Sequence, residues 1–210
     1  GNSAFRYTLV KEVTLPETIQ SIGTYAFADT PNLRKINIPS SLNIINVGVF
    51  RNSGIEEIHI PDHISQIKEY AFEESNLQSI ELPPNMIVDN YAFQGSSLIH
   101  AKIQDNTSIR AYSFADLNNL LSIELGENIS ANNRSFWGNY KLQTIITGSS
   151  IGCDQCVDGI IFGNGSNDLK TIIVRGNISY YTPYYYDWFN GDEEIYIEAD
   201  NGNTTSQMYA

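Results

Sequence analysis

Ser65-Gln66-Ile67-Lys68-Glu69-Tyr70-Ala71-Phe72-Glu73-Glu74-Ser75-Asn76-Leu77-Gln78-Ser79-Ile80-Glu81-Leu82-Pro83 is one copy of a unit that recurs along most of the chain. Phenylalanines in the position of Phe72 follow one another at steps of 22, 23, 22, 21, 21 and 22 residues. They are Phe5, Phe27, Phe50, Phe72, Phe93, Phe114 and Phe136. Self-similarity at a nearly fixed period indicates an internal repeat.

A second pattern, Leu-x-x-Ile-x-Ile, runs in phase with the phenylalanines and is closed by proline in several copies. The copies are Val10-Val13-Leu15-Pro16, Leu33-Ile36-Ile38-Pro39, Ile55-Ile58-Ile60-Pro61, Leu77-Ile80-Leu82-Pro83, Leu98-Ala101-Ile103, Leu120-Ile123-Leu125, Leu142-Ile145-Thr147 and Leu169-Ile172-Val174. Alternation of apolar and polar residues is typical of a strand, and the segment around each phenylalanine is too short for more than a turn or two of helix. We therefore predict one short strand per copy, with an irregular or short helical return.

A unit of this size cannot bury its own apolar face, so the copies must stack on one another. A period of roughly 20–29 residues is typical of leucine-rich repeats, which form solenoids. Proline lacks a backbone N–H, so Pro39, Pro61 and Pro83 are expected to end their strands.

The sequence Ile22-Gly23-Thr24-Tyr25-Ala26-Phe27, the Leu-x-x-Ile-x-Ile-Pro pattern and the 22-residue period together resemble the BspA-like leucine-rich repeat family. The resemblance covers about Ser3 to Val174 and implies a mostly β solenoid wound as a right-handed superhelix. The chain departs from the pattern where Lys68, Asp89 and Arg110 replace the glycine, and Ala-Phe is absent after Phe136. The resemblance also implies an exported, surface-associated protein of a host-associated microbe that adheres to host matrix proteins or to other cells.

The 210 residues suit one run of repeats. We expect regular repeats over residues 1–147, starting in the middle of a repeat at Ser3-Ala4-Phe5, and therefore a longer natural protein. Residues 148–210 are expected to form stretched repeats and a C-terminal cap of the same solenoid, with Phe162 and Phe189 at steps of 26 and 27. Ile195-Tyr196-Ile197 is predicted to be the last strand, followed by a polar tail or cap.

The net charge is −12, with no cluster of lysine or arginine. Nucleic acids and anionic membranes are bound largely through cationic side chains, so both are excluded as expected partners. The acidity is interpreted as favouring solubility rather than as steering a cationic ligand. The chain has no run of about 18 apolar residues and no signal-peptide pattern, so no membrane insertion is expected in this segment.

Residues between the inward positions of each strand must face outward, because successive side chains alternate. The first predicted outward column is Thr14, Asn37, His59, Glu81, Lys102, Glu124, Ile146, Ile173 and Tyr196, and the second is Glu12, Lys35, Glu57, Ser79, His100, Ser122, Thr144, Thr171 and Glu194. The columns become apolar or uncharged at Ile146, Ile173, Tyr196, Thr144 and Thr171. Exposed apolar groups on a polar face are typical of a contact site, so these five residues are predicted to bind a ligand. The alternatives are that a cap covers them or that the register slips by one residue and buries them.

Residues 180–189 are the densest aromatic segment. Tyrosine and tryptophan suit protein or sugar recognition, although a capping segment also needs aromatic side chains. Within it, Tyr184, Tyr185, Tyr186 and Trp188 are predicted to be exposed and to bind a ligand. A second aromatic row, formed by Tyr25, Tyr70, Tyr91 and Tyr112, is interpreted as packing rather than as a binding ladder.

Cys153 and Cys156 form the only Cys-x-x-Cys motif, for which a disulfide clamp or two free thiols remain open. A zinc site would need two more ligands, and the three histidines lie several repeats away. The chain shows no phosphate-binding glycine loop, His-Glu-x-x-His motif or serine elbow. We therefore predict no catalytic residues, no metal and no cofactor.

The sequence thus predicts a non-enzymatic binding module of a cell-surface or secreted protein. Its expected partner is a protein, from the host matrix or another cell surface, bound through the concave strand face. Two alternatives are glycan binding through the aromatic segment and a structural spacer that self-associates as an array. Neither the ligand nor the oligomeric state follows from the sequence.

Overall fold

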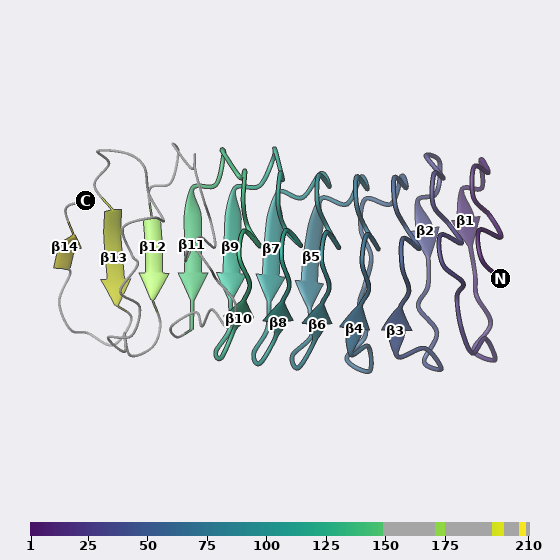
Figure 1. Ribbon diagram of the computed structural model, residues 1–210, viewed down its shortest axis with the longest axis horizontal. Helices are drawn as coiled ribbons and strands as arrows, with labels where there is room; N and C mark the ends of the chain where they lie inside the picture. Colours follow the sequence, from purple (N-terminus) through teal and green to yellow (C-terminus); the bar gives the residue numbers. More distant parts are fainter. Residues whose placement is uncertain (149–170, 175–194, 200–205, 209–210) are drawn as a thin grey trace.

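The structure is a computed structural model that describes residues 1–148, 171–174, 195–199 and 206–208 of the chain. We call each repeat unit a coil. The coils stack side by side along one long axis, with β1 near the N-terminus and β14 at the other end (Figure 1). Strands of successive coils pair in parallel. The predicted repeat solenoid is thereby confirmed as a parallel β-solenoid.

The larger of the sheets has seven strands in the order β14-β13-β12-β11-β9-β7-β5. They are β5 (Ser79–Leu82), β7 (His100–Ile103), β9 (Ser122–Leu125), β11 (Thr144–Thr147), β12 (Thr171–Val174), β13 (Ile195–Ala199) and β14 (Ser206–Met208). The strand β14 pairs antiparallel with β13. The prediction that the last strand lies at residues 195–197 is therefore wrong, because part of the expected tail adds a further strand to the sheet edge.

Two shorter strands, β1 (Glu12–Val13) and β2 (Lys35–Ile36), form a separate parallel pair at the N-terminal end. They occupy the same place in their coils as β5 does in its own. The N-terminal coils thus have the predicted strand, but in a shorter form.

A second sheet lies on another side of the solenoid, which the sequence did not predict. Its five parallel strands are β3 (Ile44–Ile45), β4 (Gln66–Ile67), β6 (Ile87–Val88), β8 (Ser108–Ile109) and β10 (Ser130–Ala131). The prediction of one strand per coil is therefore wrong for the middle coils, because two-residue strands are too short to show an alternating pattern. Within the described ranges the returns are turns, and no helix there is long and apolar enough to cross a membrane.

The core is a continuous file of phenylalanine rings, one from each coil. Phe27, Phe50, Phe72, Phe93, Phe114 and Phe136 are at most 1% exposed. Neighbouring rings stack with centroids 4.8–6.0 Å apart. Stacked aromatic pairs stabilise a core beyond the area that they bury, so each coil is held mainly by its two neighbours.

The turn that carries each phenylalanine begins with a residue in the left-handed region. Its φ is positive at Ser3, Tyr25, Gly48, Tyr70, Tyr91, Tyr112 and Arg134, with values between 52° and 60°. Such a conformation costs a non-glycine residue roughly 1–2 kcal/mol. This cost is offset by backbone hydrogen bonds between the turns of neighbouring coils, such as Phe50 N to Ala71 O at 2.8 Å and Phe72 N to Ala92 O at 2.7 Å.

The turn after the phenylalanine has two lengths, which explains part of the uneven period. Leu33, Leu120 and Leu142 follow their phenylalanines by six residues, whereas Ile55, Leu77 and Leu98 follow by five. In the longer form a hydrogen bond of 3.1 Å closes the turn, as from Leu33 N to Thr30 O. In the shorter form a small buried serine occupies the turn, as Ser75 does.

Candidate binding surface on the strand face

We call the outward side of the strands β5, β7, β9 and β11 the strand face. Backbone pairing aligns two outward columns on it. They are Glu81, Lys102, Glu124 and Ile146, and Ser79, His100, Ser122 and Thr144. Side chains in β5 and β7 alternate between exposed and buried, so the predicted columns are confirmed over these coils.

An open hollow of about 310 Å³ lies on this face. It is lined by Ser79, Ile80, Glu81, His100, Ala101, Lys102, Ser122, Ile123, Glu124 and Ile146. Every outward residue of the two columns except Thr144 lines it. Ala101 has a smaller side chain than Ile80 or Ile123 in the neighbouring coils, but all three point inward.

Charges of both signs meet within the hollow. Lys102 Nζ lies 2.9 Å from Glu81 Oε1, and Gln104 Nε2 donates to the same oxygen at 3.0 Å. The hydrogen bond from Lys102, followed by its positive charge, lowers the pKa of Glu81, although desolvation opposes the shift. Glu81 is therefore held as a carboxylate, and the pair offers a partner both an acceptor and a cation.

His100 and Ser122 provide a second polar contact on the adjacent column. His100 Nδ1 lies 2.7 Å from Ser122 Oγ, and the two residues are directly opposite each other in the parallel pairing of β7 and β9. Each side chain thereby fixes the orientation of the other. The polar part of the strand face is thus partly preorganised.

The apolar end of the face begins at Ile146, opposite Glu124. Ile146 and Thr144 are both half-buried. Because Ile146 stays in the outward column, the register has not slipped at this coil. Ile173 is paired with Ile146, and Thr171, also half-buried, with Thr144.

The predicted position of Tyr196 is wrong. Tyr196 pairs with Thr171, and Glu198 pairs with Ile173. The column of Ile146 and Ile173 therefore continues to an acidic residue, and Tyr196 belongs to the threonine column. The stretched repeat after residue 174 hid this two-residue offset, since its length does not reveal where the next strand starts.

Several predicted site residues lie outside the described residues. They are Tyr184, Tyr185, Tyr186, Trp188, Cys153 and Cys156. Their predicted roles, ligand binding for the aromatic residues and disulfide formation for the cysteines, stay predictions.

The second aromatic row is packing, as predicted. Tyr70, Tyr91 and Tyr112 are half-buried and stack in sequence, with centroids 5.4 Å apart in both pairs. Arg134 follows Tyr112 in the row and donates from Nη1 to its hydroxyl at 2.8 Å. Rings stacked on each other present their edges rather than their faces, so this row offers no flat platform for a ligand.

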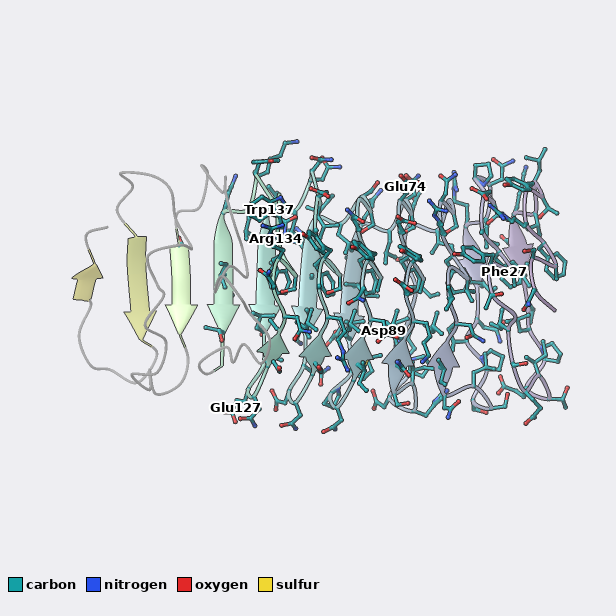
Figure 2. The ribbon with its side chains drawn as sticks, in the orientation of Figure 1. Phe27, Glu74, Asp89, Glu127, Arg134 and Trp137 are labelled. Carbon is teal, nitrogen blue, oxygen red and sulfur yellow. The ribbon has the colours of Figure 1, made fainter. Side chains whose placement is uncertain are left out.

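Figure 2 shows Arg134 next to Trp137 and places the labelled carboxylates at different edges of the stack, Glu74 and Glu127 at opposite ones. The Arg134 guanidinium lies 4.9 Å from the centre of the Trp137 ring, within cation–π range. In the part of the chain that the structure describes, no group of three or more His, Cys, Asp or Glu could hold a metal ion. The acidic side chains are thus spread over the surface.

Sequence reasoning missed two uses of asparagine. Asn37 bonds the backbone of Leu15 twice, accepting from its N–H at 2.7 Å and donating to its C=O at 2.9 Å. Asn85, Asn106 and Asn128 form a ladder in which each amide donates to the previous one, at 3.2 and 3.0 Å. The positive φ of these three residues suits asparagine, and their spacing of 21 and 22 residues was the available signal.

The comparisons agree with this geometry. The family model described as "BspA type Leucine rich repeat region" matches in six copies, over residues 1–120, 45–153 and 87–187. The chain belongs to the BspA-type leucine-rich repeat family. No curated protein matches it.

Two solved structures are similar to this BspA-type chain. A leucine-rich repeat protein from Bacteroides ovatus has 21% identity and a TM-score of 0.48, with 83% of this chain and 58% of that chain covered. The pneumococcal vaccine antigen PcpA has 17% identity and a TM-score of 0.37, with 94% and 65% covered. The chain thus spans less than two thirds of either protein.

Proposed function

We propose that this chain is a non-enzymatic binding module of a cell-surface or secreted protein, and that it adheres to a host or extracellular-matrix protein through the strand face. The observation that supports this proposal best is the hollow over β5 to β11, where the Glu81–Lys102 pair, His100 and Ile146 lie on one continuous surface. An exposed apolar group beside fixed polar groups suits a protein partner. Membership in the BspA-type leucine-rich repeat family is consistent with that role.

Binding to a panel of immobilised extracellular-matrix proteins tests the proposal. We expect the parent chain to bind at least one of them, and Ile146→Ser to weaken binding roughly tenfold, which equals about 1.4 kcal/mol. Ile87→Ser is the matched control, because Ile87 is 37% exposed on the second sheet rather than on the strand face. Circular dichroism and thermal unfolding verify that both variants are folded.

Two outcomes would contradict the proposal. One is a parent chain that binds no matrix protein, and the other is equal binding by the parent and a folded Ile146→Ser variant. A glycan panel run in parallel tests the alternative role of Tyr184, Tyr185, Tyr186 and Trp188 through the fluorescence of Trp188.

Self-association is the second candidate, since the described N-terminal coil exposes Phe5, Tyr7 and Leu9 by 43%, 70% and 70%. Light scattering over a range of concentrations tests it on the same samples. A chain that stays monomeric at high concentration would remove this candidate.

A further inference from the structure

The strand face has an interruption at the coil that precedes β5. Residues 57–60 keep the alternation of a strand, with His59 exposed and Ile60 buried. Yet these residues, all within the described part of the chain, form no backbone hydrogen bond to the coil on either side. The nearest bonds to the next coil come before them, at Asn76 N to Ser53 O and Gln78 N to Glu56 O, both 2.9 Å. The pair β1–β2 and the seven-stranded sheet are consequently separate.

The prolines explain where the interruption lies. Where a coil is paired across the strand face, the residue after its strand donates to the preceding coil: Gln104 N to Leu82 O at 3.2 Å, Gly126 N to Ile103 O and Gly148 N to Leu125 O, both at 2.8 Å. Proline has no N–H to donate. Pro39, Pro61 and Pro83 occupy this position in the three preceding coils.

One of the three missing donors is replaced by a side chain. Pro39 has no N–H that could bond to Leu15 O, and the Asn37 side chain donates to this oxygen from Nδ2 instead. This bond connects the first two coils. His59 and Glu81 hold the equivalent position in the next two coils. The Glu81 carboxylate has no donor and instead accepts from Lys102 and Gln104. His59 makes no hydrogen bond to the backbone of Ile38 among the described residues.

On its other sides, the same coil forms backbone hydrogen bonds to both neighbouring coils. In the second sheet, Gln66 pairs with Ile44 on one side and with Ile87 on the other. The phenylalanine turns are also bonded on both sides, through Phe50 N to Ala71 O and Phe72 N to Ala92 O. At this coil the strand face therefore lacks the backbone hydrogen bonds that the second sheet and the phenylalanine turn have.

The ring stack changes at the same place. The Phe27–Phe50 centroid distance, 6.0 Å, is the longest among the stacked phenylalanines, and the planes of Phe50 and Phe72 differ by 27°. The next pair, Phe72 and Phe93, is parallel within 1° at 5.1 Å. The longest distance and the largest angle between neighbouring rings of the stack thus both involve Phe50.

We propose that residues 57–60 form an articulation at which the stack opens and closes along the strand face, with the second sheet and the phenylalanine turns acting as the hinge. The N-terminal part of the face is densely charged, with Lys11, Glu12, Arg34 and Lys35, and the hollow lies on the other side of the joint. Bending there changes the angle between these two surfaces without breaking the core.

Residue-resolved amide hydrogen exchange of the whole chain tests the proposal. We expect the amides of Ile58, His59 and Ile60 to exchange roughly tenfold or more faster than those of Ala101, Lys102 and Ile103, which occupy the same places in β7. Pro83→Gln copies Gln104 and restores a donor toward Ile60 O, so it is expected to slow exchange at Ile58 and Ile60. The matched control is Pro16→Gln, which makes the same change in the first coil, where no preceding described coil offers an acceptor.

His59→Asn provides a second variant, in which the new amide copies Asn37 and reaches the backbone of Ile38. It is expected to slow exchange at Ile38, whose N–H the new side chain accepts, and it keeps the test decisive if Pro83→Gln does not fold. Equal exchange rates for Ile58–Ile60 and Ala101–Ile103 in the parent chain would overturn the proposal. So would a folded Pro83→Gln variant that leaves exchange at residues 58–60 unchanged together with a folded His59→Asn variant that leaves exchange at Ile38 unchanged.

Discussion

The residue that starts each phenylalanine turn shows how a strained conformation can suit several side chains. Tyr70, Tyr91 and Tyr112 have φ of 58–59°, and Arg134 has 57°. Stacking of the tyrosine rings offsets part of the cost of that backbone conformation. Gly48 takes the same position with φ 60°, but for a steric reason: a Cβ there would lie 2.2 Å from Tyr25 Cε1. The ring of Tyr25 thus covers the place that a side chain at residue 48 would fill.

This reasoning predicts different costs for two glycine substitutions. Gly95→Ala adds a Cβ in ordinary van der Waals contact with Glu74 Cγ, 3.6 Å away, at φ 65°, so it should cost only the unfavourable backbone conformation, about 1–2 kcal/mol. Gly48→Ala should lower the free energy of unfolding by a further ~1–3 kcal/mol, because the added methyl overpacks against Tyr25. Chemical denaturation measures both values.

The double variant Tyr25→Ala/Gly48→Ala is the control for the steric part. It should recover most of the extra loss, relative to Tyr25→Ala alone, because the clashing ring is gone. Equal losses in Gly48→Ala and Gly95→Ala would show that the Tyr25 ring moves away without cost.

Part of this residue-level picture could be predicted from the sequence. The period of the tyrosines indicated packing, and the structure confirms it. The sequence shows that Gly48 interrupts the row of tyrosines. It does not show that the Tyr25 ring occupies the space beside Gly48, because periodicity does not reveal the direction in which a ring points. The bonds from Asn37 to Leu15 were hidden for a related reason, since an outward asparagine is usually expected to face solvent.

At the scale of elements, the pairing of a strand in the larger sheet with the preceding coil follows from the donor that comes after the strand. The strands β7, β9 and β11 have four residues each and are followed by Gln104, Gly126 and Gly148, whose N–H groups bond to the preceding coil. The strand β5 also has four residues but is followed by Pro83, and it is the edge strand of this sheet, paired with β7. The prolines were correctly predicted to end strands, but their effect on the neighbouring coil was not foreseen.

Asn37→Ala should loosen the first two coils. It removes two hydrogen bonds to the Leu15 backbone, each of which contributes about 0.5–1.5 kcal/mol. We expect amide exchange at Leu15 to accelerate while exchange in β7 and β9 stays unchanged, as measured by hydrogen exchange with NMR detection.

Asn43→Ala is the matched control for this change. Asn43 is exposed in the same coil, and its side chain forms no hydrogen bond among the described residues. If both variants affect the Leu15 amide equally, the bonds of Asn37 do not hold these coils together.

Sequence patterns predicted the strand-face elements better than those of the second sheet. Four-residue strands with an inward Ile or Leu at every second place gave a clear signal. In β8 and β10 only Ile109 and Ala131 are buried. A strand with a single inward residue shows no alternation of apolar and polar residues in the sequence. The register near β13 failed for a different reason, because Phe189 follows Phe162 at a stretched step of 27 residues and so does not fix where the next strand starts.

At the scale of the whole molecule, the core is a line of contacts between neighbours rather than a compact centre. Phe93 is fully buried, and its ring lies 5.1 Å from that of Phe72 and 4.8 Å from that of Phe114. No coil of the described solenoid is shielded by more than its two neighbours in this stack. Loss of one ring should therefore act mainly on adjacent coils.

Phe93→Ala tests this arrangement. It should lower the free energy of unfolding by about 3–5 kcal/mol. Native-state hydrogen exchange should show the largest loss of protection in β5, β7 and β9, and the smallest at the turn that holds Phe27.

The matched control is Ile87→Ala, because Ile87 lies in the same coil but is 37% exposed. It should change the free energy of unfolding by less than about 1 kcal/mol. A uniform loss of protection over all coils in Phe93→Ala would mean that the solenoid unfolds as a single unit.

The two turn lengths have a consequence for how such a chain can change over generations. The phenylalanines are 21, 22 or 23 residues apart, yet their rings remain stacked within 4.8–6.0 Å. A gene that gains or loses one codon in these turns therefore still encodes the same core. Duplication or deletion of a whole coil is tolerated for the same reason, since Leu98 and Leu120 occupy equivalent places. Lineages of this protein can thus differ in length while they keep the same cross-section, and an engineer can shorten or extend the binding surface in steps of one coil.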